Sequence, residues 1–423
     1  MHDAKTCLPR TVLIRDVSRR PRTLVLMEKD SKVSYFAKTN GRQPHRLFGI
    51  HQSDRPFHVY LIGKTGTGKS SALETLALQD IACGRGVGVI DPHGDLVARL
   101  VAAIPESRKH DLIYLDAADP AQPYGYNPLR RIARDRIPLA ASGLLEAFKK
   151  LWGRDWGVRM EHILRNSLYA LLEYGEATLP DVLRILTDKA FQESVIAKVT
   201  NEQVLAFWRD EFPKYNPRYR QESISPIQNK VGAFLADPRL HRILTAPKVD
   251  LHIRHMLDER KIFLVNLGKG RLGEDSANLL GALLVTTISL AALSRAELPV
   301  ERRKPFHLYI DEFQTYTTLS VATMVAELRK FGVALTLAHQ HLHQLDLDVR
   351  HSVLGNVGTI IAFRLGPEDA LLFSREFAPT FSAMDLVNLP NYHVYLKLMI
   401  DGAPSKPFSA TTLKPEALET LEP

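Results

Sequence analysis

The sequence predicts an α/β protein with a mostly parallel sheet, an all-helical insertion within it and a small β-rich segment before it. From His58 onward, short apolar runs that end in Gly, Asp or His alternate with helical periodicity, which is typical of strands joined by crossover helices. Between Asn127 and about Val249 the apolar spacing is wholly helical. Before His58 the apolar runs are short and rich in β-branched residues.

The expected strands follow from these runs. The N-terminal segment has strand-like runs at Thr11–Ile14, Thr23–Met27 and Lys32–Phe36. The expected core strands are, in order, His58–Ile62, Gly86–Ile90, Leu112–Leu115, Ile262–Asn266, His307–Ile310, Val333–Ala338 and Thr359–Phe363. A terminal hairpin is expected from Tyr392–Ile400 and the following Gly402 and Ala403.

The same runs divide the chain into four expected segments. These are a β-rich N-terminal segment at 1–46, the first part of the core at 47–126, the all-α insertion at 127–250 and the second part of the core at 251–423. Within the insertion, four prolines are expected at helix boundaries, because proline cannot sit in a helix interior without breaking a hydrogen bond: Pro180, Pro213, Pro217 and Pro238.

The composition is that of a soluble globular protein. Of 423 residues, 45% are hydrophobic and 24% are charged, which excludes a disordered or fibrous class. Cys7 and Cys83 lack the spacing of a disulfide framework or a zinc site. No apolar run reaches the roughly 20 residues of a membrane helix, and Leu279–Leu293 is expected to be a buried helix. We therefore expect a cytoplasmic protein.

The chain is basic, with a net charge of +8 and a pI near 9.3. Clustered arginines of this kind fit nucleic-acid phosphates, or a basic face that meets only water, and charge alone does not separate the two. The clusters are Arg15, Arg19, Arg20 and Arg22, and Arg130, Arg131, Arg134 and Arg136.

A phosphate-binding loop is the most specific motif in the sequence. Residues 63–70 satisfy the pattern G-x-x-x-x-G-K-[ST], between the strand His58–Ile62 and the helix Ser71–Ala82. Backbone N–H groups of such a loop face phosphate oxygens, while Lys69 neutralises the β- and γ-phosphates and Ser70 binds Mg²⁺. The expected nucleotide-binding residues are Gly63, Thr65, Gly66, Thr67, Gly68, Lys69, Ser70 and Ser71. The sequence therefore predicts an ATP and Mg²⁺ site.

A phosphate-binding loop needs a carboxylate at the end of a neighbouring strand, and Asp311 and Glu312 follow the strand His307–Ile310. Asp311 is expected to hold Mg²⁺ through water. Glu312 is expected to polarise the attacking water as general base. Two adjacent acids could instead form a helix N-cap.

Polar residues at the ends of other strands complete the expected site. Gln340 follows Val333–Ala338 and suits a sensor of the γ-phosphate. The alternating His339, His341 and His343 also suggest a metal site, although no carboxylate or Cys supports it.

Four further residues allow two interpretations each. Asp91 or Asp95 could cap the helix that follows or could serve the nucleotide. Arg364 and Arg271 each follow a strand, so either could be an arginine finger offered to a neighbouring subunit, or a surface arginine.

With these motifs placed, the chain from about Leu47 to Leu413 resembles the HerA/FtsK superfamily of motor ATPases, and in particular conjugative coupling proteins of type IV secretion. The resemblance rests on the loop, on Leu308–Glu312, on the helical insertion with Glu222–Phe234, and on Asn266–Gly270. Further points are Asp91–Asp95, Ala338–Gln340, and Gly355 and Asn356 ahead of Arg364.

The resemblance implies a RecA-like core with an all-α domain, assembled as a hexameric homo-oligomer that threads single- or double-stranded DNA through a central pore. It also implies a secretion channel or a relaxase-type protein as partner, and so a peripheral position at the inner membrane. Many coupling proteins carry N-terminal membrane helices, and no such segment is evident in this sequence.

The first hypothesis is therefore a DNA-stimulated ATPase that moves DNA. A type IV secretion ATPase acting on protein substrates is the second, and an ATP-gated assembly or defence module of the HerA helicase kind is the third. Intact Glu312 argues against a module that rarely turns over. RecA-like single-strand recombinases fit less well, because they need no long helical block inside the core.

Overall fold

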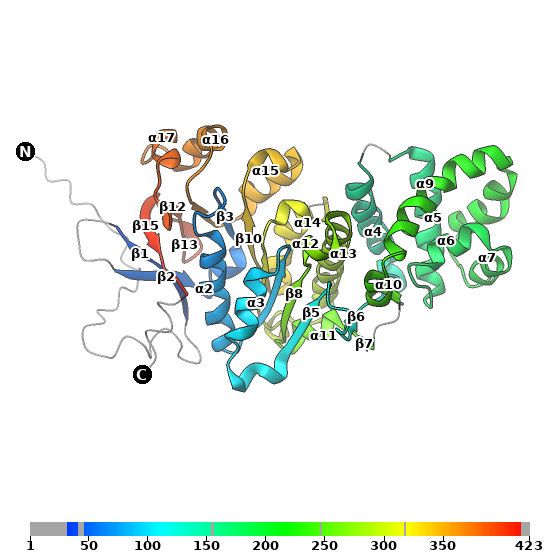
Figure 1. Ribbon diagram of the computed structural model, residues 1–423, viewed down its shortest axis with the longest axis horizontal. Helices are drawn as coiled ribbons and strands as arrows, with labels where there is room; N and C mark the ends of the chain where they lie inside the picture. The colour runs from blue at the N-terminus through cyan, green and yellow to red at the C-terminus, as the bar shows by residue number, and fades with distance from the viewer. Residues whose placement is uncertain (1–31, 41–45, 154–155, 246–247, 317–318, 416–423) are drawn as a thin grey trace, which may run out of the picture.

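The protein is described here from a computed structural model, which covers residues 32–40, 46–153, 156–245, 248–316 and 319–415. The expected strands Thr11–Ile14 and Thr23–Met27, Cys7 and the Arg15–Arg22 cluster lie outside these residues. In the described part, a large mixed sheet has helices on both faces and a helical insertion at one end (Figure 1).

One sheet of eleven strands organises the described residues, in the order β2-β1-β15-β12-β11-β3-β10-β9-β4-β8-β5. Seven neighbouring strands are parallel: β11 (Thr359–Ala362), β3 (Val59–Ile62), β10 (Val333–His339), β9 (Phe306–Ile310), β4 (Gly86–Asp91), β8 (Ile262–Asn266) and β5 (Leu112–Asp116). These are the seven core strands that the sequence predicts, each within a residue or so of its expected ends. The residues of six of these strands are buried, as expected for strands covered on both faces, whereas the edge strand β5 is mostly half-buried.

Four antiparallel strands extend the sheet beyond β11. They are β12 (His393–Lys397), β15 (Phe408–Thr412), β1 (Val33–Thr39) and β2 (Leu47–His51), and a short pair, β13 (Met399–Ile400) and β14 (Ala403–Pro404), lies between β12 and β15 in sequence. The β-rich N-terminal segment therefore joins the main sheet, because β1 pairs with β15. Since β1 and β2 form one hairpin, the expected boundary between residues 46 and 47 falls inside it.

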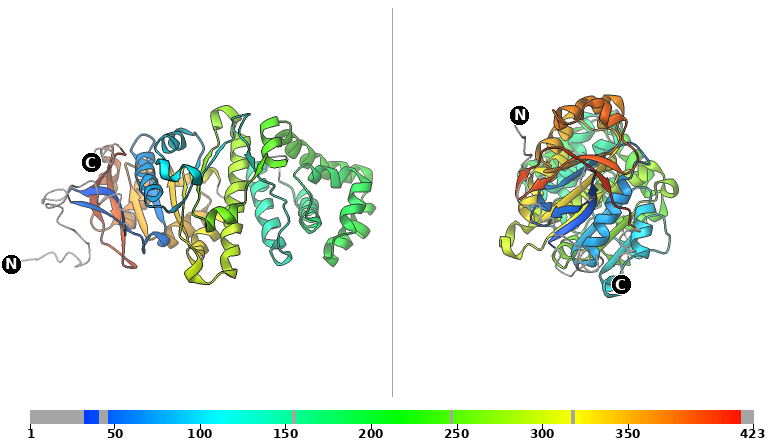
Figure 2. Two further views of the ribbon diagram at one scale, coloured as in Figure 1. Left: turned by 90° about the horizontal axis from the view of Figure 1, so that it is seen from below. Right: turned by 90° about the vertical axis from the view of Figure 1, so that its left-hand side faces the viewer.

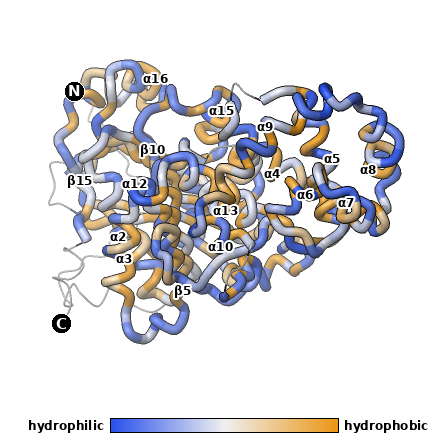
Figure 3. Tube along the Cα trace, turned by 45° about the vertical axis from the view of Figure 1, so that its right-hand side comes forward, coloured by the Kyte–Doolittle hydropathy of each residue, from blue (hydrophilic) through white to orange (hydrophobic). Residues whose placement is uncertain are grey.

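Helices cover both faces of the sheet. On one face, α2 (Lys69–Ala82) and α3 (Asp95–Ala102) share a core with β3 residues such as Val59 and Leu61. On the other face, α13 (Glu274–Leu293), α14 (Leu319–Glu327) and α11 (Ile253–Asp258) pack against the sheet. The carboxyl edge carries α12 (Lys269–Leu272), α15 (Leu347–Asn356), α16 (Pro367–Phe377) and α17 (Ala383–Val387). Figure 3 shows hydrophobic segments gathered around β10 and α13.

The insertion is a helical bundle that lies at the opposite end of the molecule from β1, β2 and β15 (Figure 2). Its helices are α4 (Ile137–Trp152), α5 (Val158–Tyr174), α6 (Asp181–Thr187), α7 (Lys189–Ile196), α8 (Glu202–Ala206), α9 (Pro217–Leu235) and α10 (Pro238–Thr245). The four boundary prolines lie at or beside helix starts, as expected. Where the chain enters and leaves, β6 (Tyr124–Gly125) pairs with β7 (Val249–Asp250), so the two connections run side by side.

Helix α4 joins the insertion to the core by packing on α13, and both contribute to one continuous hydrophobic cluster. The segment Glu274–Glu297, which contains α13, is long and apolar enough to span a membrane, and among the described residues it is the one helix that is. Since 67% of its apolar window is buried inside the fold, it is a core helix here, as the sequence predicts for Leu279–Leu293.

Candidate nucleotide-binding and hydrolysis site

The phosphate-binding loop lies between β3 and α2 and is held by the strands on both sides. Gly63 N–H donates to the carbonyl of His339 at 3.2 Å, and Lys64 N–H donates to that of Arg364 at 2.9 Å. Gly66 and Gly68 have φ angles of +75° and +118°, which side chains with a Cβ rarely adopt. A Cβ on Gly63 would lie 2.5 Å from Phe363 Cβ. The loop therefore requires glycine at these positions.

Lys69 is the cation at the centre of this loop. Its side chain is buried, and Nζ donates to the carbonyls of Gly63 at 2.6 Å and Lys64 at 3.1 Å. Burial lowers the pKa of Lys69, while the nearby Glu312 and Asp311 carboxylates raise it. A cation surrounded by loop carbonyls and facing two acids can neutralise the oxygens of a polyphosphate. Ser70 and Ser71 lie in the first turn of α2, next to it.

Asp311 meets the loop directly, because Ser70 Oγ donates to Asp311 Oδ2 at 3.2 Å. Burial first, and then the neighbouring Glu312 and Asp91 carboxylates, raise the pKa of Asp311 to about 6, although Lys69 lowers it. A hydroxyl and a buried carboxylate are oxygen ligands that fit Mg²⁺, which prefers few protein ligands together with substrate phosphates. The described residues contain no group of three or more His, Cys, Asp or Glu that could bind a metal alone.

Glu312 is held in place by side-chain amides. Gln314 Nε2 donates to Glu312 Oε2 at 2.6 Å, and Gln340 Nε2 donates to Glu312 Oε1. Thr65 Oγ1 in turn donates to Gln340 Oε1 at 2.9 Å, so Gln340 joins the phosphate-binding loop to Glu312. Glu312 has φ +47°, a left-handed conformation that costs energy in a non-glycine residue and is common at active sites.

The alternative that these acids only cap a helix is not supported. Glu312 precedes the short turn Phe313–Thr315 but makes no capping bond with its side chain. Asp91 does cap: its Oδ2 accepts from Leu96 N at 2.9 Å and Val97 N at 3.2 Å.

The three alternating histidines have separate partners. His339 is buried and shares a 2.8 Å hydrogen bond with Tyr60, and burial lowers the pKa of His339 to about 3. His341 lies 3.4 Å from Asp369, and His343 lies 2.9 Å from Glu368. This arrangement gives no support to a histidine metal site.

The two candidate arginine fingers lie on opposite sides of the loop. Arg364 follows β11 and donates to the carbonyl of Leu389 at 3.3 Å and to Asn391 Oδ1 at 2.9 Å. Arg271 lies beside the far edge strand β5 and pairs with Asp116 at 2.9 Å through an exposed side chain. Both side chains are engaged within their own chain, so a finger role in a neighbouring subunit remains a prediction.

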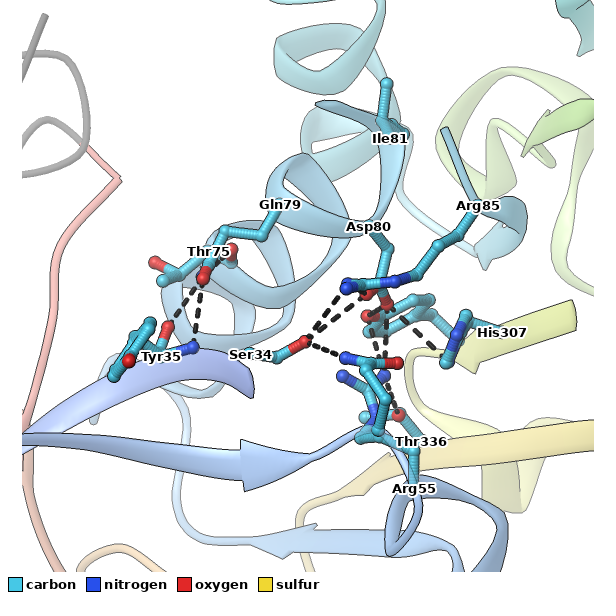
Figure 4. A network of polar contacts seen from close by, with 12 residues as sticks. Ser34, Tyr35, Arg55, Thr75, Gln79, Asp80, Ile81, Arg85, His307 and Thr336 are labelled. Atoms are coloured by element: carbon cyan, nitrogen blue, oxygen red, sulfur yellow. Dashed lines mark hydrogen bonds and ion pairs between the residues drawn. The ribbon is translucent and has the colours of Figure 1, made fainter. Parts of the chain in front are cut away.

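A buried polar network, which the sequence does not predict, surrounds Asp80 near the end of α2 that is farther from the phosphate-binding loop (Figure 4). Arg55 is completely buried, and its Nη2 donates to Asp80 at 3.2 Å, to Tyr309 Oη at 2.9 Å and to Thr336 Oγ1 at 3.5 Å. Asp80 also pairs with Arg85 at 2.7 Å. Since these residues come from different elements, no local pattern in the sequence marks them.

This network connects the elements that carry the site. Asp80 lies on α2, which begins at Lys69; Tyr309 lies on β9, which leads to Asp311; and Thr336 lies on β10, which leads to Gln340. The N-terminal hairpin takes part as well. Ser34 Oγ donates to Asp80 at 3.3 Å, and Gln79 bonds both backbone groups of Tyr35 in β1.

The chain is similar in sequence and in fold to known coupling proteins. Residues 271–370 match the family model of the type IV secretion-system coupling protein DNA-binding domain. The type 4 coupling protein DotL of Legionella pneumophila is 22% identical over 371 residues, which are 73% of this chain and 47% of DotL. The chain therefore spans about half the length of this curated relative.

Solved structures share the fold. The plasmid coupling protein TrwB, in complex with ADP and Mg²⁺, superposes with a TM-score of 0.62 at 18% identity, over 86% of this chain and 87% of TrwB. VirB4 of Thermoanaerobacter pseudethanolicus gives a TM-score of 0.63 at 14% identity, over 92% of this chain and 98% of VirB4. These matches confirm the predicted resemblance to coupling proteins of the P-loop ATPase superfamily and the predicted α/β fold.

Proposed function

We propose that this protein hydrolyses ATP to move DNA, as a hexameric motor of the conjugative coupling-protein type. The observation that carries the hydrolytic part is the convergence of four groups from two neighbouring elements: Lys69 and Ser70 from α2, and Asp311 and Glu312 from the end of β9. Gln340, at the end of β10, links Glu312 to the loop. TrwB, with the same fold, has been captured with ADP and Mg²⁺ and with an ATP analogue.

Each residue has one task in this proposal. The loop N–H groups and Lys69 bind the phosphates, and Ser70 and Asp311 hold Mg²⁺, which supplies charge neutralisation at the phosphate oxygens. Glu312 accepts the proton of the attacking water, and Gln340 orients both that water and Glu312. Glu312 is about nine-tenths buried, so its carboxylate is shielded from bulk water, and its electrostatic interactions are stronger than they would be in water.

DNA is the proposed track, because residues 271–370 match a DNA-binding domain and the chain carries a net charge of +8. The subunits are proposed to assemble into a ring. In such a ring, Arg271 or Arg364 of one subunit reaches the nucleotide bound by the next subunit. Coupling proteins such as DotL suggest a secretion channel or a relaxase-type protein as partner, and a cytoplasmic position at the inner membrane.

The test is steady-state ATP hydrolysis by the purified protein with no nucleic acid, with single-stranded DNA and with duplex DNA. Lys69→Ala is the background control. The proposal expects a Lys69-dependent rate that DNA raises severalfold and that salt reduces, because phosphate contacts release counterions. A Lys69-dependent rate that neither DNA form changes contradicts the DNA track, and no such rate contradicts the ATPase itself.

A second candidate is a secretion ATPase acting on protein. VirB4 shares the fold over 92% of this chain and TrwB over 86%, so the fold does not separate a protein substrate from DNA. For this second candidate a protein substrate, and not DNA, should raise the same Lys69-dependent rate.

A further inference from the structure

The direction of a bound nucleotide follows from the order of the strands. Glu312 and Gln340, which are proposed to act on the γ-phosphate, stand at the ends of β9 and β10. The phosphate-binding loop follows β3, and the next strands on the other side are β11 and β12. A triphosphate whose γ end faces β9 and β10 therefore directs its sugar and base toward β11 and β12.

Tyr392 stands on that side of the loop, immediately before β12. Its N–H donates to the carbonyl of Thr67 in the loop at 2.8 Å. Its own carbonyl accepts from Thr412 N–H at 2.8 Å and from Thr412 Oγ1 at 3.1 Å. Tyr392 has φ +67°, which is unusual for an aromatic residue. Bonds on both sides hold it in this costly conformation, as happens where a side chain must point in one direction.

The Tyr392 ring lies against the loop. A Cβ placed on Gly68 would be 2.8 Å from Tyr392 Cδ1 and 3.3 Å from Cε1, so only glycine leaves room for the ring. The ring is partly exposed, and the exposed Lys414 side chain places its ammonium over the ring, 4.7 Å from the centroid. A nucleobase that stacks on this face takes the place of the Lys414 ammonium, which can then contact the acceptor atoms of the base.

Arg364 supports this segment. Its guanidinium donates to the carbonyl of Leu389 and to Asn391 Oδ1, within the three residues before Tyr392. Its own carbonyl accepts from Lys64 N–H in the phosphate-binding loop. Arg364 thus ties the loop and the Tyr392 segment to the same strand end.

We propose that Tyr392 is the nucleobase platform of this site, on which a purine nucleoside triphosphate stacks, with Lys414 beside the base. This inference rests on the proposed nucleotide site and extends it to the base, which neither the motif nor Asp311 and Glu312 specify. A purine is favoured because its two fused rings cover more of the tyrosine than a pyrimidine does.

The test compares a ligand that carries a nucleobase with a polyphosphate that does not. Equilibrium binding of ATP, and of inorganic tripolyphosphate, is measured with Mg²⁺ for the wild type and for Tyr392→Ala, Tyr392→Phe and Tyr395→Ala. Tyr395 is a matched control, since it lies on β12, three residues after Tyr392, and its ring stacks on that of Phe381 with the centroids 3.7 Å apart. Thermal melting checks that each variant is folded.

Tyr392→Ala should weaken ATP binding roughly tenfold, by loss of stacking, and leave tripolyphosphate binding unchanged. Tyr392→Phe and Tyr395→Ala should bind both ligands as the wild type does. If Tyr392→Ala weakens the binding of ATP and of tripolyphosphate equally, or weakens neither, the inference about the base is wrong, whereas the proposed nucleotide site is unaffected. If the wild type binds neither ligand more tightly than Lys69→Ala does, the proposed function itself fails.

Discussion

Gln340 donates its side-chain amide to Glu312 and accepts a 2.9 Å hydrogen bond from Thr65, so one side chain joins the phosphate-binding loop to the proposed general base. Gln340 lies at the end of β10, between the strands that carry the other two residues. Gln340 therefore connects the loop to Glu312 through side-chain hydrogen bonds alone. We expect the orientation of Glu312 to depend on Gln340 as well as on Gln314.

Replacing Gln340 by Ala should lower kcat by about tenfold or more and change KM little, because the phosphates are still bound by Lys69 and the loop. Steady-state kinetics separates the two constants. Thr65→Val removes the same chain of bonds from its other end and should lower kcat in the same direction. A large rise in KM with normal kcat would show that Gln340 serves binding instead.

Glu312→Gln should retain ATP binding and reduce kcat by roughly 10²–10⁴-fold, since an amide cannot accept the proton of the attacking water. Single-turnover hydrolysis, measured together with ATP binding, tests both halves of this expectation. Lys69→Ala is the comparison, because it should lose the phosphate contact as well. An unchanged rate in Glu312→Gln would assign the base to another residue.

Replacing Arg55 by Met should destabilise the protein by about 3 kcal/mol, because it removes a completely buried cation from the buried Asp80 carboxylate, which keeps Arg85 as a partner. Urea unfolding measures the free energy change. Arg271→Ala is the matched control: its pair with Asp116 is exposed, so the loss should be within about 1 kcal/mol. Equal effects of the two substitutions would mean that burial of the Arg55 pair does not matter.

The sequence predicts those parts of the structure that depend on residues close together in the chain. The seven parallel strands are continuous apolar runs, and the loop is a contiguous motif, so their elements are found as expected. The pairing of β1 with β15 could not be predicted, because its partners are far apart in the chain. The Arg55–Asp80 pair and the contact of Tyr392 with Gly68 could not be predicted for the same reason, because only the folded chain brings the two residues of each pair together.

The stability of the protein should fall as pH decreases from 7 to 5, because three histidines are buried in the neutral form. Burial lowers the pKa of His58 to about 4 and those of His307 and His339 to about 3, from 6.5. Below pH 6.5 the unfolded chain binds protons that the folded protein does not. Each histidine therefore removes about 1.4 kcal/mol of stability per pH unit within that window.

Asp311 acts in the opposite direction below about pH 6, because its raised pKa lets the folded protein bind a proton that the unfolded chain binds only at lower pH. Its effect on stability offsets that of about one of the three histidines. Between pH 6 and 5 the unfolded chain therefore binds close to two protons more than the folded protein does, and this difference sets the slope of stability against pH. Urea unfolding of the metal-free protein at pH 7, 6 and 5 measures this slope. His307→Asn should reduce it by one proton, whereas the exposed His343→Asn should not, and a slope that His307→Asn leaves unchanged would mean that His307 is charged in the fold.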